Sequence, residues 1–232
     1  MRNKQVKSII LLSGGLDSLV SLGLKKNELN IKLAITFDYG QKSLKKELEA
    51  SSKICHYYGV EHKIIKLDWL KDITQTSLVS ENKIPTQEEQ INDDSARSVW
   101  VPNRNGLFLN IAASFSDAQG FDYFLIGANK EEGQTFPDNT LEFINRVNKE
   151  FEYSTLRQPK IIAPLINYNK NDRVMLALEH KSPLEFTMSC YQKQRGHCGE
   201  CESCTRLKHA LQYNKADKYL KILFEGYENT IY

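Results

Sequence analysis

The sequence predicts an α/β protein built on a doubly wound, parallel, five-stranded sheet. Short apolar runs alternate along the chain with amphipathic stretches of helical period, an order typical of βαβ units. The first apolar run leads directly into a glycine-rich turn and a helical stretch. Parallel sheets carry helices on both faces, and they bind ligands at the carboxyl ends of their strands. We therefore expect the functional residues at the strand ends.

Five short apolar runs predict the strands. In chain order they are residues 8–12, 32–37, 62–67, 123–126 and 160–163. The fourth run ends at Gly127. Pro164 stops the fifth run, because proline has no N–H group for a sheet ladder.

The stretches between these runs predict helices at residues 18–27, 44–58, 106–119, 141–153 and 171–180. The last of these is expected to be capped by Asn171 or a neighbour and to end before Pro183. A polar, turn-rich region at residues 71–98 predicts a mobile excursion from the sheet. Apolar spacing in the third helix predicts one buried face, made of Leu107, Ile111, Phe115 and Ala118.

Composition narrows the class of protein. The chain has 232 residues, is 41% hydrophobic and carries a net charge of +2 with both signs mixed throughout. This balance is against nucleic-acid binding, which favours a concentrated basic surface. No apolar run approaches the ~18 residues of a membrane helix, and the N-terminal run is too short for a signal peptide. We expect a cytoplasmic protein with no membrane partner.

Residues 13–18 have the sequence Ser-Gly-Gly-Leu-Asp-Ser and are called here the glycine loop. A strand, a tight turn and a helix start aim backbone N–H groups at one point, which suits an anion such as phosphate. The spacing is neither a Walker A motif nor a dinucleotide fingerprint. A plain Gly-Gly turn is the simpler interpretation. The predicted nucleotide-binding residues are Leu12, Ser13, Gly14, Gly15, Leu16, Asp17, Ser18, Leu19, Val20, Ser21 and Leu22.

Two further strand ends carry polar groups. Asp38, Tyr39 and Gln41 follow the second strand and suit recognition of a nucleoside or a metal, or form an ordinary turn. After the fourth strand come three carboxylates that could hold Mg²⁺ through oxygen ligands or form a solvated loop. These carboxylates belong to Glu131, Glu132 and Asp138.

Two basic residues also stand out. Arg104 lies near a helix start, where a cation opposes the helix dipole unless an anion is bound. A surface salt bridge is the alternative. Lys170 opens the last predicted helix and either reaches a phosphate as a point charge or faces solvent.

Four of the five cysteines form a C-x7-C-x2-C-x2-C pattern near the C-terminus. Four thiolates supply a closed tetrahedral zinc site, which supports folding rather than chemistry. An iron–sulfur cluster is the alternative, and the neighbouring His197 could compete as a ligand. The remaining Cys55 is expected to be a core thiol. The predicted ligands are Cys190, Cys198, Cys201 and Cys204.

The glycine loop resembles the pyrophosphate (PP) loop of the ATP pyrophosphatases. With the other motifs, the chain resembles the 7-cyano-7-deazaguanine synthase family nearly end to end. The matching strings are Thr-Phe-Asp-Tyr-Gly-Gln at 36–41, Val-Pro-Asn-Arg-Asn at 101–105, Phe-Leu at 108–109, Phe-Pro-Asp at 136–138, Ser-Cys-Tyr at 189–191 and the cysteine-rich residues 197–204. The family often has Gly at Asn103, and a Tyr-Pro-Asp-Cys-Arg string where residues 136–140 stand, so a basic residue is missing there.

The resemblance implies conversion of 7-carboxy-7-deazaguanine and ammonia into a nitrile, with ATP and Mg²⁺ as cofactors and one structural Zn²⁺. It implies a domain of the adenine-nucleotide α-hydrolase-like fold at residues 1–182, a helical zinc-binding region at 183–232, and a homodimer. It places Asp17 and either Asp138 or Glu132 near the metal, and Arg104 and Lys170 near phosphates or the substrate carboxylate. The implied substrate contacts are Asp38, Tyr39, Gln41, Asn105, Glu132 and Phe136.

Three other functions stay open at this point. One is another PP-loop enzyme, such as a tRNA thiolase, which needs a persulfide cysteine or an iron–sulfur cluster. A second is a defence homologue that transfers the activated deazaguanine to another molecule. The third is not an enzyme but a zinc-ribbon binding module on a degenerate nucleotide-binding domain.

Overall fold

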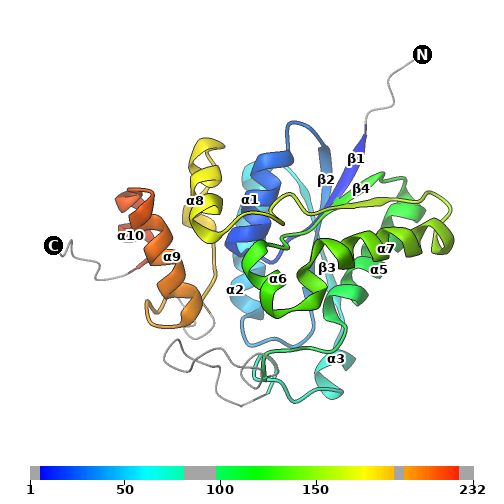
Figure 1. Ribbon diagram of the computed structural model, residues 1–232, viewed down its shortest axis with the longest axis horizontal. Helices are drawn as coiled ribbons and strands as arrows, with labels where there is room; N and C mark the ends of the chain where they lie inside the picture. The colour runs from blue at the N-terminus through cyan, green and yellow to red at the C-terminus, as the bar shows by residue number, and fades with distance from the viewer. Residues whose placement is uncertain (1–5, 81–97, 191–195, 225–232) are drawn as a thin grey trace.

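A computed structural model describes residues 6–80, 98–190 and 196–224, and within them the chain forms one five-stranded parallel sheet with the order β3-β2-β1-β4-β5. Figure 1 shows helices on both sides of this sheet. Each neighbouring pair of strands is parallel. The predicted fold class is confirmed.

All five predicted strands are present, and each boundary lies within two residues of the expected one. They are β1 Lys7–Leu11, β2 Asn30–Asp38, β3 Glu61–Lys66, β4 Tyr123–Leu125 and β5 Lys160–Ile162. The central strand β1 pairs Ile10 with Ala34 on one side and with Leu125 on the other. Strands β1, β2 and β4 therefore end close together.

Side chains that alternate along β1 separate two hydrophobic cores. Ile10 belongs to the core shared with helices α1 Leu16–Lys25, α2 Leu44–Tyr58 and α8 Lys170–Glu179. Ile9 belongs to the core under α5 Arg104–Gln119 and α7 Leu141–Ser154, on the opposite face (Figure 1). Strands buried on both faces explain the continuous apolar runs of the sequence.

The predicted buried face of α5 is wrong in part. The deepest residues of this helix are Leu109, Ala112, Ala113 and Ser116, whereas Ala118 is exposed. The predicted Leu107, Ile111 and Phe115 are only partly buried at the side of the contact. The small side chains of Ala112, Ala113 and Ser116 let α5 lie close against β1 and β4. The face of α5 that is buried is therefore the one that packs closely on the sheet, and not the one with the largest apolar side chains.

Helix α8 is capped by Asn169, a near neighbour of the predicted cap Asn171, and begins one residue earlier than predicted. The Asn169 side chain accepts a hydrogen bond from the Asp172 N–H, and the Asp172 carboxylate accepts one from the Asn169 N–H, each at 3.0 Å. This reciprocal capping box fixes the start of the helix. As a result Lys170, its first residue, lies at the edge of the sheet where the strands end.

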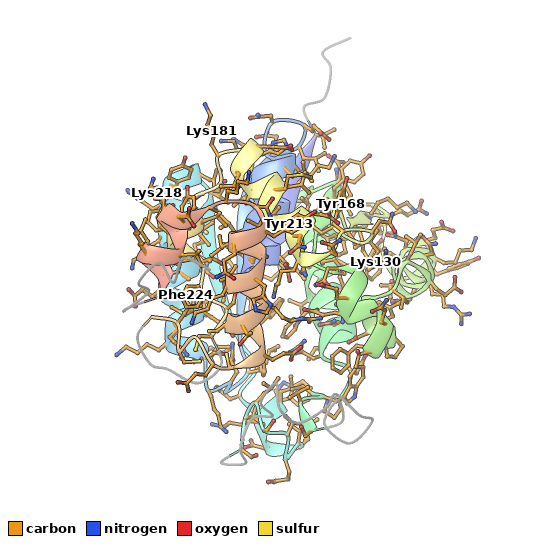
Figure 2. The ribbon with its side chains drawn as sticks, turned by 60° about the vertical axis from the view of Figure 1, so that its left-hand side comes forward. Lys130, Tyr168, Lys181, Tyr213, Lys218 and Phe224 are labelled. Atoms are coloured by element: carbon orange, nitrogen blue, oxygen red, sulfur yellow. The ribbon has the colours of Figure 1, made fainter. Side chains whose placement is uncertain are left out.

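The C-terminal helices α9 Glu202–Tyr213 and α10 Asp217–Leu223 pack in sequence beside α8. Figure 2 turns this side forward. In that view Lys181 lies just after α8, Tyr213 is the last residue of α9, and Lys218 belongs to α10. Leu207 and Leu211 of α9 share a core with Val174 of α8. The division of the chain at residue 182 stays a prediction.

Three shorter elements follow strands β3 and β4. They are α3 Trp69–Asp72, α6 Lys130–Thr135 and the 3-10 helix η1 Pro137–Asn139. A second 3-10 helix, η2 Leu184–Phe186, follows α8 and packs against α2 and α10. Most of the predicted excursion at 71–98 lies outside the described residues. Within the described part of the chain, no helix is both long and apolar enough to cross a membrane.

Candidate active site

A cavity of about 610 Å³ opens at the carboxyl ends of β1, β2 and β4. Ser13 follows β1, Tyr39 follows β2 and Gly127 follows β4, and all three line the cavity. Helices α5, α6, α8 and α9 complete the wall. This is the position expected for a ligand in a parallel sheet.

The glycine loop joins β1 to α1 as predicted, but only part of the predicted nucleotide-binding segment reaches the cavity. Leu12, Ser13, Asp17 and Ser18 line it. Inside the loop, the Ser18 hydroxyl donates to the Gly15 carbonyl at 3.1 Å, and the Gly15 N–H donates to Ser13 Oγ at 3.3 Å. Gly14 and Gly15 form the turn and are not part of the cavity lining. The remaining predicted residues, all on α1, are buried in the core: Leu16, Leu19, Val20, Ser21 and Leu22.

Replacing Gly14 with alanine is expected to lower both stability and the use of ATP. Gly14 has φ 77°, and an added Cβ would lie 2.7 Å from Cβ of Ala50 and 3.0 Å from the carbonyl oxygen of Glu47, both on α2. The left-handed conformation alone costs alanine about 1–2 kcal/mol, and the clash displaces the loop. Thermal unfolding and the KM for ATP measure the two effects.

The matched control is Gly59→Ala. Gly59 also has positive φ, 65°, but an added Cβ would meet nothing within 4 Å. This variant is expected to lose stability and keep the KM for ATP. An unchanged KM for ATP in the Gly14→Ala variant would show that the position of the loop does not matter for nucleotide binding.

A buried arginine, which the sequence analysis missed, joins two of the acidic residues. Arg173 is 1% exposed, and its guanidinium donates to Asp17 Oδ1 and to Glu131 Oε2. The second oxygen of Asp17 accepts a hydrogen bond from Asn129 Nδ2 at 3.2 Å. We call this set of four residues the arginine bridge. The only signal for it in the sequence is that Arg173 lies one turn after Lys170 on the same helix.

Glu132 and Lys170 face the same part of the cavity and line it together. Burial and the nearby Asp17 carboxylate raise the pKa of Glu132, although the Asn129 side chain, Arg173 and Lys170 act in the opposite direction. Burial lowers the pKa of Lys170, against the effect of Asp17 and Glu132. Glu132 and Lys170 thus bring a carboxylate and an ammonium to the cavity, where each would favour a group of opposite charge.

The other wall of the cavity is aromatic and carries Arg104. The Arg104 guanidinium donates to the Tyr39 hydroxyl at 3.3 Å, and Phe108 stacks on Phe37 with ring centroids 3.9 Å apart. Trp100, also missed by the sequence analysis, stacks with Phe136 at 5.9 Å. Flat rings along one wall with a cation beside them suit a planar heterocycle that carries a negative group.

Not every predicted substrate residue presents a free polar group to the cavity. The Gln41 side chain accepts from the Tyr39 N–H and donates to the Phe37 carbonyl, so it braces the turn after β2. Asp38 accepts a hydrogen bond from the Gly40 N–H and does not line the cavity. These contacts support the simpler interpretation of this strand end as an ordered turn, with Tyr39 on its cavity side.

Asn105 and Asp138 meet at the far end of this wall. Asn105 Nδ2 lies 3.5 Å from the Asp138 carbonyl, and both residues line the cavity. Burial raises the pKa of Asp138, while Arg104 partly counters this effect. Asn139 donates to the Asp138 carboxylate at 3.0 Å, and Thr140 caps α7. The residues that stand where the resembled family has a cysteine and an arginine therefore serve local structure.

The four predicted cysteine ligands lie together, with their sulfur atoms all within 4.8 Å of one another. Cys198 Sγ and Cys204 Sγ are 3.8 Å apart, close to the ~3.8 Å separation of two thiolates bound to one tetrahedral zinc ion. The N–H groups of Glu200 and Cys201 donate to Cys198 Sγ at 3.4 and 3.2 Å. Such donors favour a thiolate, so the donor set fits one metal ion.

His197 and Cys55 lie outside the group of four cysteine ligands. His197 Nε2 accepts a hydrogen bond from the Ser189 N–H at 3.2 Å and does not belong to the cysteine group. Cys55 is 3% exposed in the core, and burial raises the pKa of its thiol to about 12. Cys55 is therefore an unreactive core thiol, as predicted.

A parallel sheet whose first turn is Ser-Gly-Gly-Leu-Asp-Ser, opening into a cavity lined by lysine, arginine and carboxylates, defines the class of PP-loop ATP pyrophosphatases. A family model described as queuosine biosynthesis protein QueC matches residues 7–215. The chain belongs to this family.

Two curated relatives and one solved structure illustrate the similarity. The 7-cyano-7-deazaguanine synthase of Methanosarcina barkeri is 46% identical over 217 residues, which cover 89% of this chain and 94% of the relative. That of Bdellovibrio bacteriovorus is 42% identical over 230 residues, covering 96% and 99%. The U34-tRNA thiolase NcsA from Methanococcus maripaludis has a TM-score of 0.49 at 18% identity, covering 94% of this chain and 69% of that chain.

Proposed function

We propose that the chain converts 7-carboxy-7-deazaguanine and ammonia into 7-cyano-7-deazaguanine, with ATP as the activating reagent. The observation that carries this proposal is one cavity that joins the glycine loop to an aromatic wall carrying Arg104. Membership of the QueC family and the names of the curated relatives point to the same reaction.

The chemistry explains why the cavity needs both the glycine loop and the aromatic wall with Arg104. A carboxylate oxygen is a poor leaving group, so it first attacks the α-phosphorus of ATP, and pyrophosphate leaves. Ammonia then attacks the acyl carbon, AMP leaves with the oxygen, and an amide remains. The amide oxygen attacks the α-phosphorus of a second ATP, and a second pyrophosphate leaves. Loss of AMP with that oxygen, and of both protons from the nitrogen, yields the nitrile. The glycine loop and Lys170 stabilise the departing pyrophosphate in both activations.

Arg104 is the cation assigned to the substrate carboxylate. It lies on the aromatic wall, and the loop at residues 136–140 contains no basic side chain. The flat deazaguanine ring packs along Trp100 and Phe136, and Asn105 lies at the end of the same wall. In this arrangement the carboxylate points toward the glycine loop, where the α-phosphorus is attacked.

Glu132 and Asp138 fit a magnesium ion bound with ATP. Both are carboxylates that line the cavity, and burial raises the pKa of each, so each gains from a nearby cation. Asp17 is less available, because both of its oxygens already accept hydrogen bonds in the arginine bridge. Magnesium supplies positive charge for the phosphates, while the four cysteines hold a structural zinc ion away from the reaction.

A tRNA thiolase is disfavoured by the cysteines. Thiolation needs a persulfide cysteine or an iron–sulfur cluster, and four of the five cysteines lie within reach of a single ion. The fifth, Cys55, is buried and unreactive. Net charge of +2 also supports small-molecule substrates. The proposal includes a cytoplasmic homodimer, and analytical ultracentrifugation tests its oligomeric part.

Incubation of the purified protein with 7-carboxy-7-deazaguanine, ammonium and Mg-ATP is the direct test. Mass spectrometry is expected to detect 7-cyano-7-deazaguanine, with AMP and pyrophosphate formed alongside it. ¹⁵N-ammonium should place the label in the nitrile. Pyrophosphate release without any cyano product would contradict the proposal, as would transfer of the deazaguanine to a protein or nucleic acid.

The rate of pyrophosphate release is expected to fall on both sides of a narrow pH optimum. Burial and Asp17 raise the pKa of Glu132, so this side chain takes up a proton at a higher pH than an ordinary glutamate. Burial lowers the pKa of Lys170, so its positive charge is lost at a lower pH than for an ordinary lysine. Turnover measured across pH in wild type and in Glu132→Gln checks this, because the variant has no carboxylate to protonate. An acidic limb in the ordinary glutamate range would contradict the assignment.

A further inference from the structure

Arg173 is a fully buried charge whose position the reaction described above does not require. Its Nε donates to the Asn169 carbonyl at 3.2 Å, and its two terminal nitrogens donate to Asp17 and Glu131. Asp17 belongs to the first turn of α1, and Glu131 to the first turn of α6. One side chain of α8 therefore joins the starts of two other helices at the edge of the cavity. Figure 2 shows α6, whose first residue Lys130 is labelled, beside α8 and α9.

Stability alone does not account for such an arrangement. Removing an arginine and two carboxylates from water costs much of the energy that their attraction returns. The charges around Arg173 indicate a role in ligand binding instead. Asp17, Glu131 and Glu132 bring three carboxylates to the place where the proposed function requires a triphosphate. Arg173 and Lys170 oppose them, and Arg206 of α9 lies 4.0 Å from Glu131.

We propose that Arg173 is a positioning residue for ATP: it fixes the Asp17 carboxylate beside the glycine loop and cancels the charge of Asp17 and Glu131, so that a polyanion can bind there. This inference rests on the proposed function, since it assumes that the triphosphate lies at the loop. The planar guanidinium is required because it reaches two carboxylates at once, which a lysine ammonium does not do with the same geometry. Arg173 acts through Asp17 and touches no reacting atom.

Three variants and one control test the proposal. Arg173→Met removes the charge, and Arg173→Lys keeps the charge but not the planar guanidinium that reaches two carboxylates. The double variant Arg173→Met/Glu131→Gln also removes one of those two carboxylates. Arg157→Met is the control, because Arg157 pairs with Asp122 at 3.5 Å outside the cavity. We expect the KM for ATP to rise at least about tenfold in Arg173→Met, to rise less in Arg173→Lys, and to be partly restored in the double variant. The control should keep the wild-type KM.

A second readout separates positioning from stability. The split between KM and kcat reports whether Arg173 acts on ATP binding. Because Arg173 touches no reacting atom, its loss should raise the KM for ATP more than it lowers kcat. Arg173→Lys, which keeps the charge, should restore part of the KM for ATP. A purely structural arginine would change the melting temperature and leave the KM for ATP in place, and that result would overturn the proposal.

Calorimetry with a non-hydrolysable ATP analogue keeps this test separate from the proposed function. If wild type binds the analogue but forms no cyano product, the proposed function fails while the comparison of variants still stands. If Arg173→Met does not fold, Arg173→Lys decides. Weaker binding of the analogue supports the proposal, and wild-type binding of the analogue together with a wild-type KM for ATP overturns it.

Discussion

Replacing Asp17 with asparagine or alanine should abolish turnover in a protein that still folds and still binds zinc. The Asp17 carboxylate lies in the first turn of α1, accepts hydrogen bonds from Arg173 and Asn129, and lines the cavity next to the glycine loop. Asparagine keeps the size of the side chain but not its charge, so Arg173 is left with only one carboxylate partner. We expect ATP-dependent turnover to fall at least about 100-fold, the loss typical of a misplaced electrostatic group in an active site.

The measurement is pyrophosphate release and cyano-product formation, together with thermal unfolding and metal content. Asp122→Asn is the control, because Asp122 also pairs with an arginine, Arg157, and does not line the cavity. That variant should turn over like wild type. Turnover near the wild-type rate in Asp17→Asn would remove Asp17 from the reaction site.

Replacing Cys201 with serine should release the metal and lower the melting temperature strongly. Cys201 is fully buried between the turn at Cys198 and the start of α9. Structural zinc supplies about 10–16 kcal/mol in small zinc-dependent folds. Even a loss of about 4 kcal/mol would lower the melting temperature of a chain of this size by about 8–16 °C. Helix α9 also carries Glu202 and Arg206 to the cavity, so turnover should fall as well.

Cys55→Ala is the matched control for the zinc prediction. Cys55 is equally buried but lies outside the group of ligands. It should lose some packing energy and keep a full equivalent of zinc, measured by elemental analysis. An unchanged melting temperature and metal content in Cys201→Ser would show that the cysteines do not hold a structural zinc ion.

The sequence was sufficient for the strands, the glycine loop and the cysteine group, because each depends on local pattern. Buried parallel strands need continuous apolar runs, a tight turn with φ 77° at Gly14 favours glycine, and closely spaced cysteines converge through short turns. Elements that depend on distance were predicted less well. The buried face of α5 was wrong in part, because the approach of the helix to the sheet decides it.

Only the tertiary structure determined which charges meet. Arg173 and Asp17 are 156 positions apart in the chain, and no spacing rule joins them or connects Trp100 to Phe136. The structure also showed that Asp38 does not line the cavity, and that the Gln41 side chain, although it lines the cavity, is already hydrogen-bonded to the Phe37 carbonyl and to Glu47. Periodicity and turn chemistry are properties of neighbouring residues and can be read from their order. Pairing of buried charges depends on how helices from distant parts of the chain pack together, because burial decides which groups must find partners.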